Sequence, residues 1–393
     1  MTDDLEILLS DGFRRSVEEN LGRDPLRIAL DRSLPHAAIV ASQVKYLRRA
    51  GSKFPSWHAA RCIIPPLAFE QSSSEATAAL KEYSGALAID LTCGLGVDSR
   101  ALSKRFRRVI ALERDATLAA IARENFRRLG ADNIEIVNIS AEEFLSDGGI
   151  RADLVYADPD RRSDAGKKMV RPEYCSPDII ALLPAIGRVA PRLVVKLSPL
   201  FDIDEVFRVF GPNARAEVVS LDGECKEVIA DVRFGSRTAD TPGPVIRAVA
   251  IGLGEVEYPA NDDRTLPELT FEPERYTHLA VPDVALQKAR LARRYLTDRG
   301  IRIDSDNGYG FATERPGNII GKVLEIESME PFDPKELKRR LKARGIKSID
   351  ILKRDFPLSA ADIARQSGVR QGGAMKIAFT KAAGHLWQIT LRP

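Results

Sequence analysis

The sequence predicts an α/β protein in which a helical region precedes a doubly wound parallel sheet and a small α+β module follows it. Two observations lead to this fold class. Short apolar strands alternate with helical segments from residue 87 to about 234, and the strand at 88–91 runs into a glycine loop and then a helix. Alternation of this kind is typical of parallel sheets covered by helices. At 393 residues the chain is long enough for two or three domains.

Residues 1–80 are expected to form a helical N-terminal region. Four apolar residues recur at helical spacing: Ile39, Val40, Val44 and Leu47. Three prolines then break the pattern: Pro55, Pro65 and Pro66. The start of the chain is acidic where a signal peptide would be basic, and no stretch of 18 apolar residues occurs. The sequence therefore predicts a soluble, cytoplasmic protein that makes no contact with a membrane.

Residues 81–235 are expected to be the domain that carries the doubly wound sheet. Its predicted strands are 87–91, 109–113, 134–137, 154–158, 193–197, 216–220 and 227–234. The last two are joined by the short polar segment 221–225, which predicts a hairpin and an antiparallel final strand.

The rest of the chain is expected to contain a linker and then the α+β module. Residues 235–275 are rich in Pro, Asp and Thr and predict a linker or variable loops, after which 284–296 is helical and 322–327 alternates like a strand. In residues 331–393, Asp333 and Ser359 are expected to cap helices that end at Gly345 and Gly368. Together with the strands at 322–327 and 348–353 and a hairpin of 375–380 with 386–391, these helices give the order β-α-β-α-β-β from residue 322 onward.

Charge is unevenly placed along the chain. Residues 331–393 hold 14 Lys and Arg against 5 Asp and Glu, a net +9, whereas the whole chain has +3. A strongly basic module beside a near-neutral one indicates a polyanionic partner, most simply nucleic acid. The four cysteines form no C-x-x-C pair, so the sequence predicts buried thiols and neither a disulfide framework nor a metal site.

The glycine loop indicates a nucleotide-like ligand at the end of the first strand. Asp90 precedes Gly94 and Gly96, and a dinucleotide fingerprint would want a third Gly or Ala where Ser99 stands. Glu113 closes the next strand, where it can accept two hydrogen bonds from a ribose diol in either cofactor class. Only the glycine loop and Glu113 support a nicotinamide oxidoreductase.

A third strand end favours a different cofactor. The fourth strand leads into Asp158-Pro159-Asp160-Arg161-Arg162. The glycine loop, Glu113 and this Asp-Pro step, in this order, resemble the class I S-adenosylmethionine-dependent methyltransferases, which have a Rossmann-like sheet. The resemblance implies that Asp90, Gly94 and Gly96 hold the methionine end of the cofactor and Glu113 its ribose. It places Ser140 and Ala141 near the adenine, and Ser140 stands where an Asp is common.

Two readings of the target atom stay open. The Asp158-Pro159 step is similar to the Asp-Pro-Pro-aromatic motif of enzymes that methylate exocyclic amines, but Asp160 and Arg161 replace its last two residues. Pro159, Arg161 and Arg162 are expected to meet the substrate, Arg161 by stacking or by clamping a phosphate; the structural alternative for Arg161 is an ion pair with Asp160 or Asp164.

The second reading rests on a charged residue in an apolar strand. Lys196 ends the strand 193–197, where a charge needs a partner. Asp158, Lys196 and Glu227 resemble three members of the Lys-Asp-Lys-Glu tetrad of ribose 2′-O-methyltransferases, in which a lysine stabilises the attacking alkoxide. The first lysine is missing, since none is closer to the glycine loop than Lys81, and Lys196 has a structural alternative as the partner of Asp158 or Glu227. Methylation of cytosine carbon 5 is disfavoured, because residues 158–162 hold no cysteine nucleophile.

Separated markers make most of the chain resemble bacterial class I methyltransferases with a THUMP-like C-terminal domain and a small ferredoxin-like domain. The markers are QSSSEATA (71–78), YADPDRR (156–162), KLSP (196–199), ECKE (224–227) and KRDFPLSAA (353–361). The resemblance implies a linker and ferredoxin-like domain in 236–330, a basic THUMP-like domain in 331–393, and RNA, tRNA or rRNA, as substrate.

In this family the segment before the glycine loop closes over the cofactor, so at least one of Ser73, Ser74, Glu75 and Thr77 is expected to contact its methionine end; their structural alternative is a helix N-cap. The leading hypothesis is methyl transfer to a base nitrogen or ribose oxygen of structured RNA. The alternative is a catalytically silent RNA-binding protein that retains the cofactor pocket.

Overall fold

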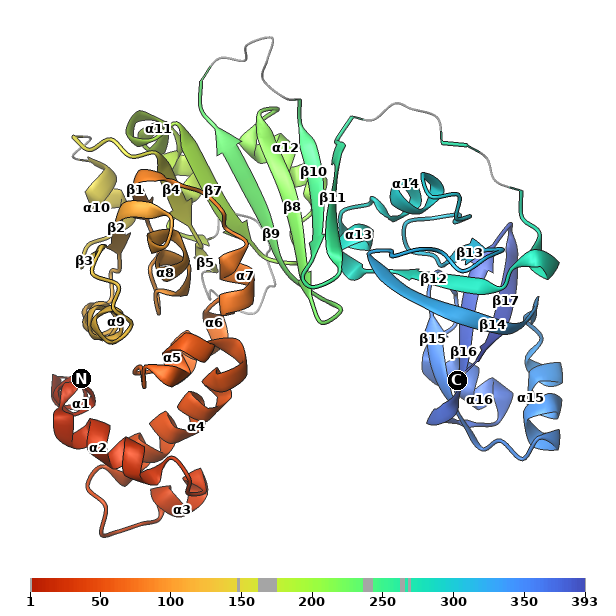
Figure 1. Cartoon of the computed structure of the whole chain (residues 1–393), viewed down its shortest axis with the longest axis horizontal. Coiled ribbons are helices and arrows are strands. Elements are labelled where there is room, and N and C mark those ends of the chain that lie inside the picture. Colours follow the sequence, from red (N-terminus) through yellow and green to blue (C-terminus); the bar gives the residue numbers. More distant parts are fainter. Residues whose placement is uncertain are drawn as a thin grey trace. The chain divides into compact units, whose positions relative to one another are not determined.

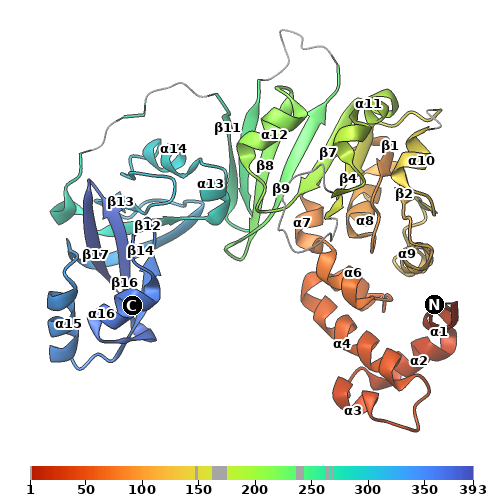
Figure 2. The ribbon, with the colours of Figure 1, turned by 180° about the vertical axis from the view of Figure 1, so that it is seen from behind.

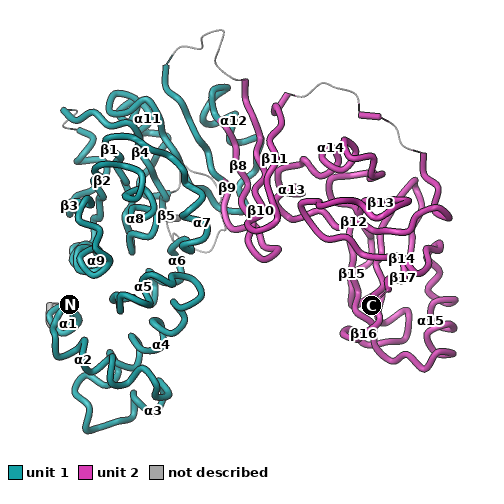
Figure 3. Tube along the Cα trace, in the orientation of Figure 1, with its two compact units in different colours: residues 1–214, 229–241 teal, residues 215–228, 242–393 magenta. Residues whose placement is uncertain are grey.

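The computed structural model describes residues 2–146, 149–161, 175–235, 243–261, 266–267 and 270–392. The chain divides into two compact units, which Figure 3 draws in two colours. The first unit comprises Met1–Ala214 and Ile229–Thr241, and the second comprises Arg215–Val228 and Pro242–Pro393.

The N-terminal region is helical, as predicted. Its helices are α1 (Thr2–Leu9), α2 (Asp11–Asn20), α3 (Pro25–Ala29), α4 (Ala37–Lys53), α5 (Pro55–Ala59), α6 (Pro66–Gln71) and α7 (Glu75–Ala79). Pro55 and Pro66 begin helices, because the first position of a helix needs no N–H donor. Val40, Val44 and Leu47 of α4 are buried in a core with Leu95 and Val97, which follow the first strand.

The large sheet has the predicted doubly wound form. Its strands are β1 (Gly85–Asp90), β2 (Phe106–Leu112), β3 (Ile134–Val137), β4 (Leu154–Ala157), β7 (Arg192–Leu197), β8 (Ala214–Leu221), β9 (Glu224–Arg233), β10 (Val245–Ala250) and β11 (Gly254–Pro259). They run in the order β11-β10-β8-β9-β7-β4-β1-β2-β3. β1 pairs in parallel with β2 and β4, and β4 with β7.

Helices connect the strands of the first unit and cover both faces of its sheet. They are α8 (Val97–Ser103), α9 (Ala116–Arg128), α10 (Ala141–Ser146), α11 (Ile179–Val189) and α12 (Ile203–Phe210). α8 and α9 lie on one face, whereas α10 and α11 contact each other on the other (Figures 1 and 2). Because β1, β2 and β4 are parallel neighbours, their carboxyl ends meet at one edge, where in open α/β sheets ligands bind.

The structure differs from the sequence prediction after β9. The expected hairpin is present, since only Asp222 and Gly223, both with positive φ, separate β8 from β9. The linker predicted for 235–275, however, contains β10 and β11, which extend the sheet. β10 is a short run of mostly apolar residues, of which Ala248, Val249 and Ala250 are buried. The prolines and glycines on either side of it dominate the composition of the segment, and for this reason the sequence predicts a linker.

The second unit has a six-stranded sheet of order β13-β12-β14-β17-β16-β15. Its strands are β12 (His278–Pro282), β13 (Gly310–Ala312), β14 (Gly321–Pro331), β15 (Ser348–Lys353), β16 (Arg370–Ala382) and β17 (His385–Leu391). Its helices are α13 (Val284–Lys288), α14 (Ala292–Thr297), α15 (Pro334–Ala343), α16 (Ala360–Ser367) and the 3₁₀ turn η2 (Pro273–Arg275).

The predicted β-α-β-α-β-β order of the C-terminal module is confirmed. Asp333 caps α15, Ser359 caps α16, and Gly368 ends α16 in the left-handed conformation. One sheet joins this module to β12 and β13, so the predicted border at residue 331 stays a prediction. Within the described residues, no helix has the length and apolar character of a membrane span, and no group of His, Cys, Asp or Glu is arranged to hold a metal ion.

Candidate active site

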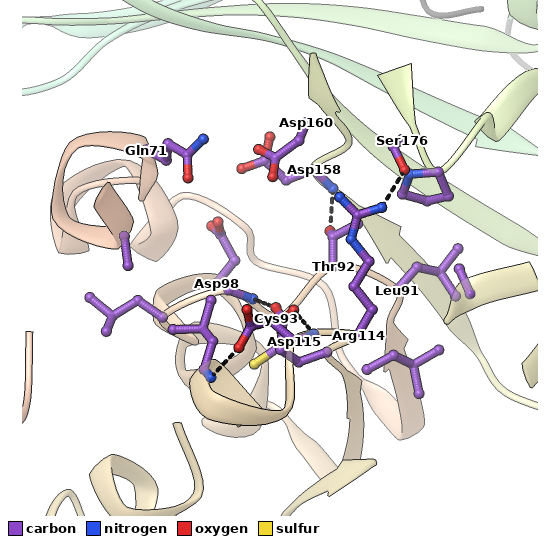
Figure 4. A pocket seen from close by; sticks show the side chains of 18 of the residues that line it. Gln71, Leu91, Thr92, Cys93, Asp98, Arg114, Asp115, Asp158, Asp160 and Ser176 are labelled. Atoms are coloured by element: carbon purple, nitrogen blue, oxygen red, sulfur yellow. Dashed lines mark hydrogen bonds between the residues drawn. The ribbon is translucent and has the colours of Figure 1, made fainter. Parts of the chain in front are cut away.

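A pocket of about 320 Å³ opens at the carboxyl ends of β1, β2 and β4 in the first unit. Figure 4 shows Gln71 on one side of it and Asp158 with Asp160 on the other. Six predicted site residues line it: Ser73, Gly94, Glu113, Ser140, Ala141 and Asp158. The segment between α6 and α7 contributes Ser72 and Ser73, so the N-terminal region closes one wall.

The two glycines of the loop serve different purposes. Gly96 caps α8 with a φ of 89°, and a Cβ placed there would lie 2.3 Å from Cζ of Phe126. Gly94 has a φ of 56°, and a Cβ there would meet no atom within 4 Å. Gly96 is therefore required for packing beneath the loop, whereas Gly94 leaves open space beside its backbone.

Asp90 supports the loop from beneath. Its carboxylate is buried and accepts hydrogen bonds from the Thr92 amide at 2.9 Å and from the Ser99 hydroxyl at 2.5 Å. Burial raises the pKa of Asp90 to about 7, although these two hydrogen bonds act to lower it. Asp90 is not among the residues that line the pocket, so its contact is with the loop. Ser99, the residue that counted against a dinucleotide fingerprint, is its partner.

Glu113 lies between the loop and the pocket. Its carboxylate accepts the amide of Gly94 and that of Asp115, both at 2.9 Å. Burial raises the pKa of Glu113 above its usual value, and the two amides oppose this shift. A carboxylate has about four acceptor positions, so two amides leave capacity for donors from a ligand.

The serines of the predicted cofactor site act as helix caps. Ser140 exchanges hydrogen bonds with Glu143 at the start of α10 and also lines the pocket. Ser74 caps α7 by accepting the Thr77 amide at 3.1 Å, and neither Ser74 nor Thr77 is among the pocket-lining residues. Their neighbour Ser73 lines the pocket instead.

Asp158 is held from two sides at the end of β4. Its amide donates to the Thr92 hydroxyl at 2.6 Å, a contact drawn in Figure 4, which ties the end of β4 to the end of β1. Its carboxylate accepts from Nζ of Lys196 at 2.6 Å. The predicted Asp158–Lys196 pair is thus present, and both residues belong to the first unit.

A chain of polar groups continues from Lys196 through two pocket-lining residues to a buried lysine. Nζ of Lys196 also donates to the Ser73 hydroxyl at 2.9 Å, and that hydroxyl donates to Asp98 at 2.8 Å. Asp98 forms an ion pair with Nζ of Lys81 at 2.9 Å. Burial alone would raise the pKa of Asp98, but the charges of Lys81 and Lys196 outweigh it and lower that pKa. Sequence reasoning proposed Ser73 as a cofactor contact but not as a partner of Lys196; it missed Asp98 and noted Lys81 only as too distant.

The remaining predicted residues lie at the margin of the pocket or outside it. Asp160 lines the pocket with Arg114, whose guanidinium donates to Ser176 at 2.8 Å. Arg161 lies opposite Cys175 in the antiparallel backbone pairing of β5 (Asp160–Arg161) with β6 (Cys175–Ser176). Pro159 is not among the pocket-lining residues, and Arg162 lies outside the described residues. Glu227 is buried in the part of β9 that belongs to the second unit.

The charge of the pocket favours a cationic ligand. Of the described residues, six carboxylates line it, namely Asp98, Glu113, Asp115, Glu142, Asp158 and Asp160, against one guanidinium, that of Arg114. Asp98 and Asp158 are paired with Lys81 and Lys196, which leaves four carboxylates without a lysine partner in these two pairs. An acidic surface attracts and orients a positively charged molecule. A ligand that carries a sulfonium and an amino group fits these acceptors.

Comparison with known proteins agrees with this geometry. The chain is 25% identical over 330 residues to an uncharacterised S-adenosylmethionine-dependent methyltransferase of Mycobacterium tuberculosis, covering 82% of this chain and 86% of that protein. It matches the crystal structure of a candidate methyltransferase from Porphyromonas gingivalis W83 with a TM-score of 0.83, 25% identity and 98% coverage of both chains. Residues 321–393 match the model of the THUMP domain-like family. The chain is an S-adenosylmethionine-dependent methyltransferase with a Rossmann-like sheet and a C-terminal THUMP-like domain.

Shorter matches concern the cofactor half of this methyltransferase. Residues 70–149 match the model of the tRNA (uracil-5-)-methyltransferase family. A ribosomal RNA small subunit methyltransferase J of Francisella philomiragia is 32% identical over 79 residues, which are 18% of this chain and 33% of that protein. The family-model match ends before Asp158, so it bears on the part of the methyltransferase that forms the glycine loop and not on the atom that is methylated.

Proposed function

We propose that this methyltransferase acts on structured RNA, tRNA or rRNA, and that Asp158, with Lys196 beside it, faces the target atom. The observation that carries the proposal is the position of Asp158, on the pocket wall at the end of β4 and paired at 2.6 Å with Lys196. RNA as substrate is supported by the basic THUMP-like module and by the partial similarity to RNA methyltransferases.

Each part of the cofactor has a suitable group in the pocket. The backbone at Gly94 and the carboxylate of Glu113 are suited to the methionine end and the ribose, and Ser140 with Ala141 to the adenine. Asp90 and Gly96 act indirectly by fixing the loop. S-adenosylmethionine supplies an activated methyl carbon when bound, so the protein has to bind, orient and exclude water.

Asp158 and Lys196 suit either of the two nucleophiles. The Asp158 carboxylate can accept a proton from an amine or a hydroxyl, and the Lys196 ammonium holds that carboxylate in place. Transfer to a base nitrogen or to a ribose oxygen are both compatible with this pair. Arg161 and Arg162 follow Asp158 and are expected to meet the RNA.

Cofactor binding is tested by calorimetry with S-adenosylhomocysteine. The Glu113→Ala variant is expected to bind at least tenfold more weakly, because it loses charge-assisted hydrogen bonds to the ribose. Glu135→Ala, a change at an exposed carboxylate in β3, is the matched control. Equal affinity of the Glu113→Ala variant and the wild type would disprove the assignment of Glu113.

Methyl transfer is tested with tritium-labelled cofactor and total RNA from a strain that lacks this chain. Wild-type protein is expected to label RNA, and Asp158→Ala to abolish labelling while S-adenosylhomocysteine still binds. Asp132→Ala is the control at an exposed carboxylate between α9 and β3. Absence of labelling, combined with intact binding of cofactor product and RNA, would instead establish the silent RNA-binding alternative. Nucleoside mass spectrometry of the labelled RNA identifies the methylated atom.

A further inference from the structure

The buried groups behind Asp158 form a continuous chain that five separate segments contribute. Lys81 follows α7, Asp98 lies in α8, Ser73 precedes α7, Lys196 ends β7 and Asp158 ends β4. Each neighbour in the chain lies within 2.9 Å of the next. The exposed fraction of the charged side chains rises along it, from 0% for Lys81 through 10% for Asp98 and 13% for Lys196 to 30% for Asp158. The chain therefore begins in the core and ends at the pocket.

The direction of each hydrogen bond in the chain is determined by chemistry. The Ser73 hydroxyl has one proton, which it donates to Asp98. It must therefore accept from Lys196, whose ammonium has no acceptor capacity. Two ammonium and two carboxylate groups balance in charge, which is the condition for burying them at all. Lys196 consequently has a fixed position between Ser73 and Asp158.

We propose that Ser73, Asp98 and Lys81 are positioning residues for methyl transfer, which act by holding Lys196 against the Asp158 carboxylate. This inference rests on the proposed role of Asp158. It also gives a function to the segment before β1, because Ser73 of that segment and Asp98 of α8 line the cofactor pocket while they direct Lys196 toward the target side. Assembly of the cofactor wall and orientation of Asp158 thus depend on the same residues.

The kinetic test uses variants that break the chain at one link. Ser73→Ala and Asp98→Asn are each expected to lower the rate of methyl transfer at saturating cofactor and RNA about tenfold. The double variant is expected to be no slower than either, because both changes interrupt one chain. Ser73→Thr, which keeps the hydroxyl, is expected to restore most of the rate.

The matched control breaks a different ion pair on the same strand. Arg192 begins β7, at the end opposite Lys196, and pairs with Asp231 at 2.5 Å. Arg192→Met is expected to lower stability without lowering the rate of methyl transfer at saturating cofactor and RNA. Additive losses in the double variant, together with no rescue by Ser73→Thr, would overturn the positioning role and leave a structural one.

A second measurement follows Lys196 without an activity assay. In protein labelled with ¹⁵N-lysine, the ammonium signal that Lys196→Arg removes is expected to exchange with water at least tenfold faster in Ser73→Ala than in wild type. Unchanged exchange would show that the hydrogen bond from Lys196 to Ser73 does not hold the ammonium group in place. If this signal responds to Ser73→Ala but wild-type protein labels no RNA, the chain exists while the proposed function and the positioning role both fail.

Discussion

Asp90 has a buried carboxylate whose oxygens accept the hydrogen bonds that hold the glycine loop. Burial raises its pKa in the folded protein to about 7, from 3.8 for the free side chain. Between these values the folded state binds more protons than the unfolded state, so this group's contribution to stability falls as the pH rises from about 4 through 7.

The Asp90→Asn substitution removes this pH dependence. We expect the free energy of unfolding of the variant, relative to wild type, to increase between pH 4 and pH 8 by up to a few kcal/mol. Urea denaturation at several pH values measures it, with Asp132→Asn as the exposed control. A difference that stays constant across this range would show that Asp90 titrates normally.

Gly94 and Gly96 are expected to respond differently to the same substitution. Gly96→Ala forces a Cβ against Phe126 as well as an unfavourable φ, and should cost about 2–4 kcal/mol of stability. Gly94→Ala adds only the strain of its positive φ, about 1 kcal/mol, but places a methyl group beside the pocket and should weaken S-adenosylhomocysteine binding. Chemical denaturation measures the loss of stability and calorimetry measures the loss of binding. Similar losses of stability in the two variants would contradict the prediction.

Sequence reasoning reached those site residues that lie at strand ends. Gly94, Glu113 and Asp158 could be predicted because motif order and strand order place them at one sheet edge. Ser73 could be predicted only as a cofactor contact and Asp98 not at all, because the hydrogen bonds that link them to Lys196 bring together positions 123 and 98 residues from it in the sequence. Nothing in sequence spacing tells which buried charge pairs with which.

Helix α15 presents a basic stripe at the scale of a single element. Lys335, Lys338 and Lys342 are exposed and spaced three and four residues apart, so they lie along one face. Replacing all three with Glu is expected to weaken RNA binding at least tenfold and to reduce the slope of log affinity against log salt, because fewer counterions are released.

The control for the stripe makes the same charge change elsewhere. Arg14, Arg15 and Arg107 are exposed residues of α2 and β2 in the first unit. If their replacement with Glu weakens RNA binding as much as that of the three lysines does, the basic module is not the main binding surface. Filter binding at several salt concentrations measures both sets.

Helices and strands were predicted correctly where the hydrophobic pattern agrees with the capping residues and terminal glycines. The helices of the C-terminal module have a Ser or Asp cap at the start and Gly345 or Gly368 beyond the end, and both were found. The helix expected over 284–296 is two helices, because Arg290 adopts a φ of 56° between them. β10 and β11 were missed because β10 joins the sheet by parallel pairing with β8, 30 residues earlier in the chain, and β11 by pairing with β10, and local composition indicates neither pairing.

At the scale of the whole molecule, the cofactor pocket lies in one compact unit and the THUMP-like match in the other. S-adenosylhomocysteine at one hundred times its Kd should stabilise the unit that binds it by about 2.7 kcal/mol. We expect hydrogen exchange to slow in β1, β2 and β4 and to stay unchanged in β16 and β17. Equal slowing in both sets of strands would mean that the two units unfold together.

The core of the helical region includes Leu95 and Val97, which lie after the first strand of the sheet. During synthesis, α4 and α5 therefore leave the ribosome with Phe54 and Trp57 still lacking two of their packing partners. At about 5–20 residues per second, the chain takes a few seconds to supply them. The helical region consequently has no complete core as a nascent fragment. It becomes stable only when the glycine loop has been made, so the N-terminal wall of the cofactor pocket and the loop it faces arise in one folding event.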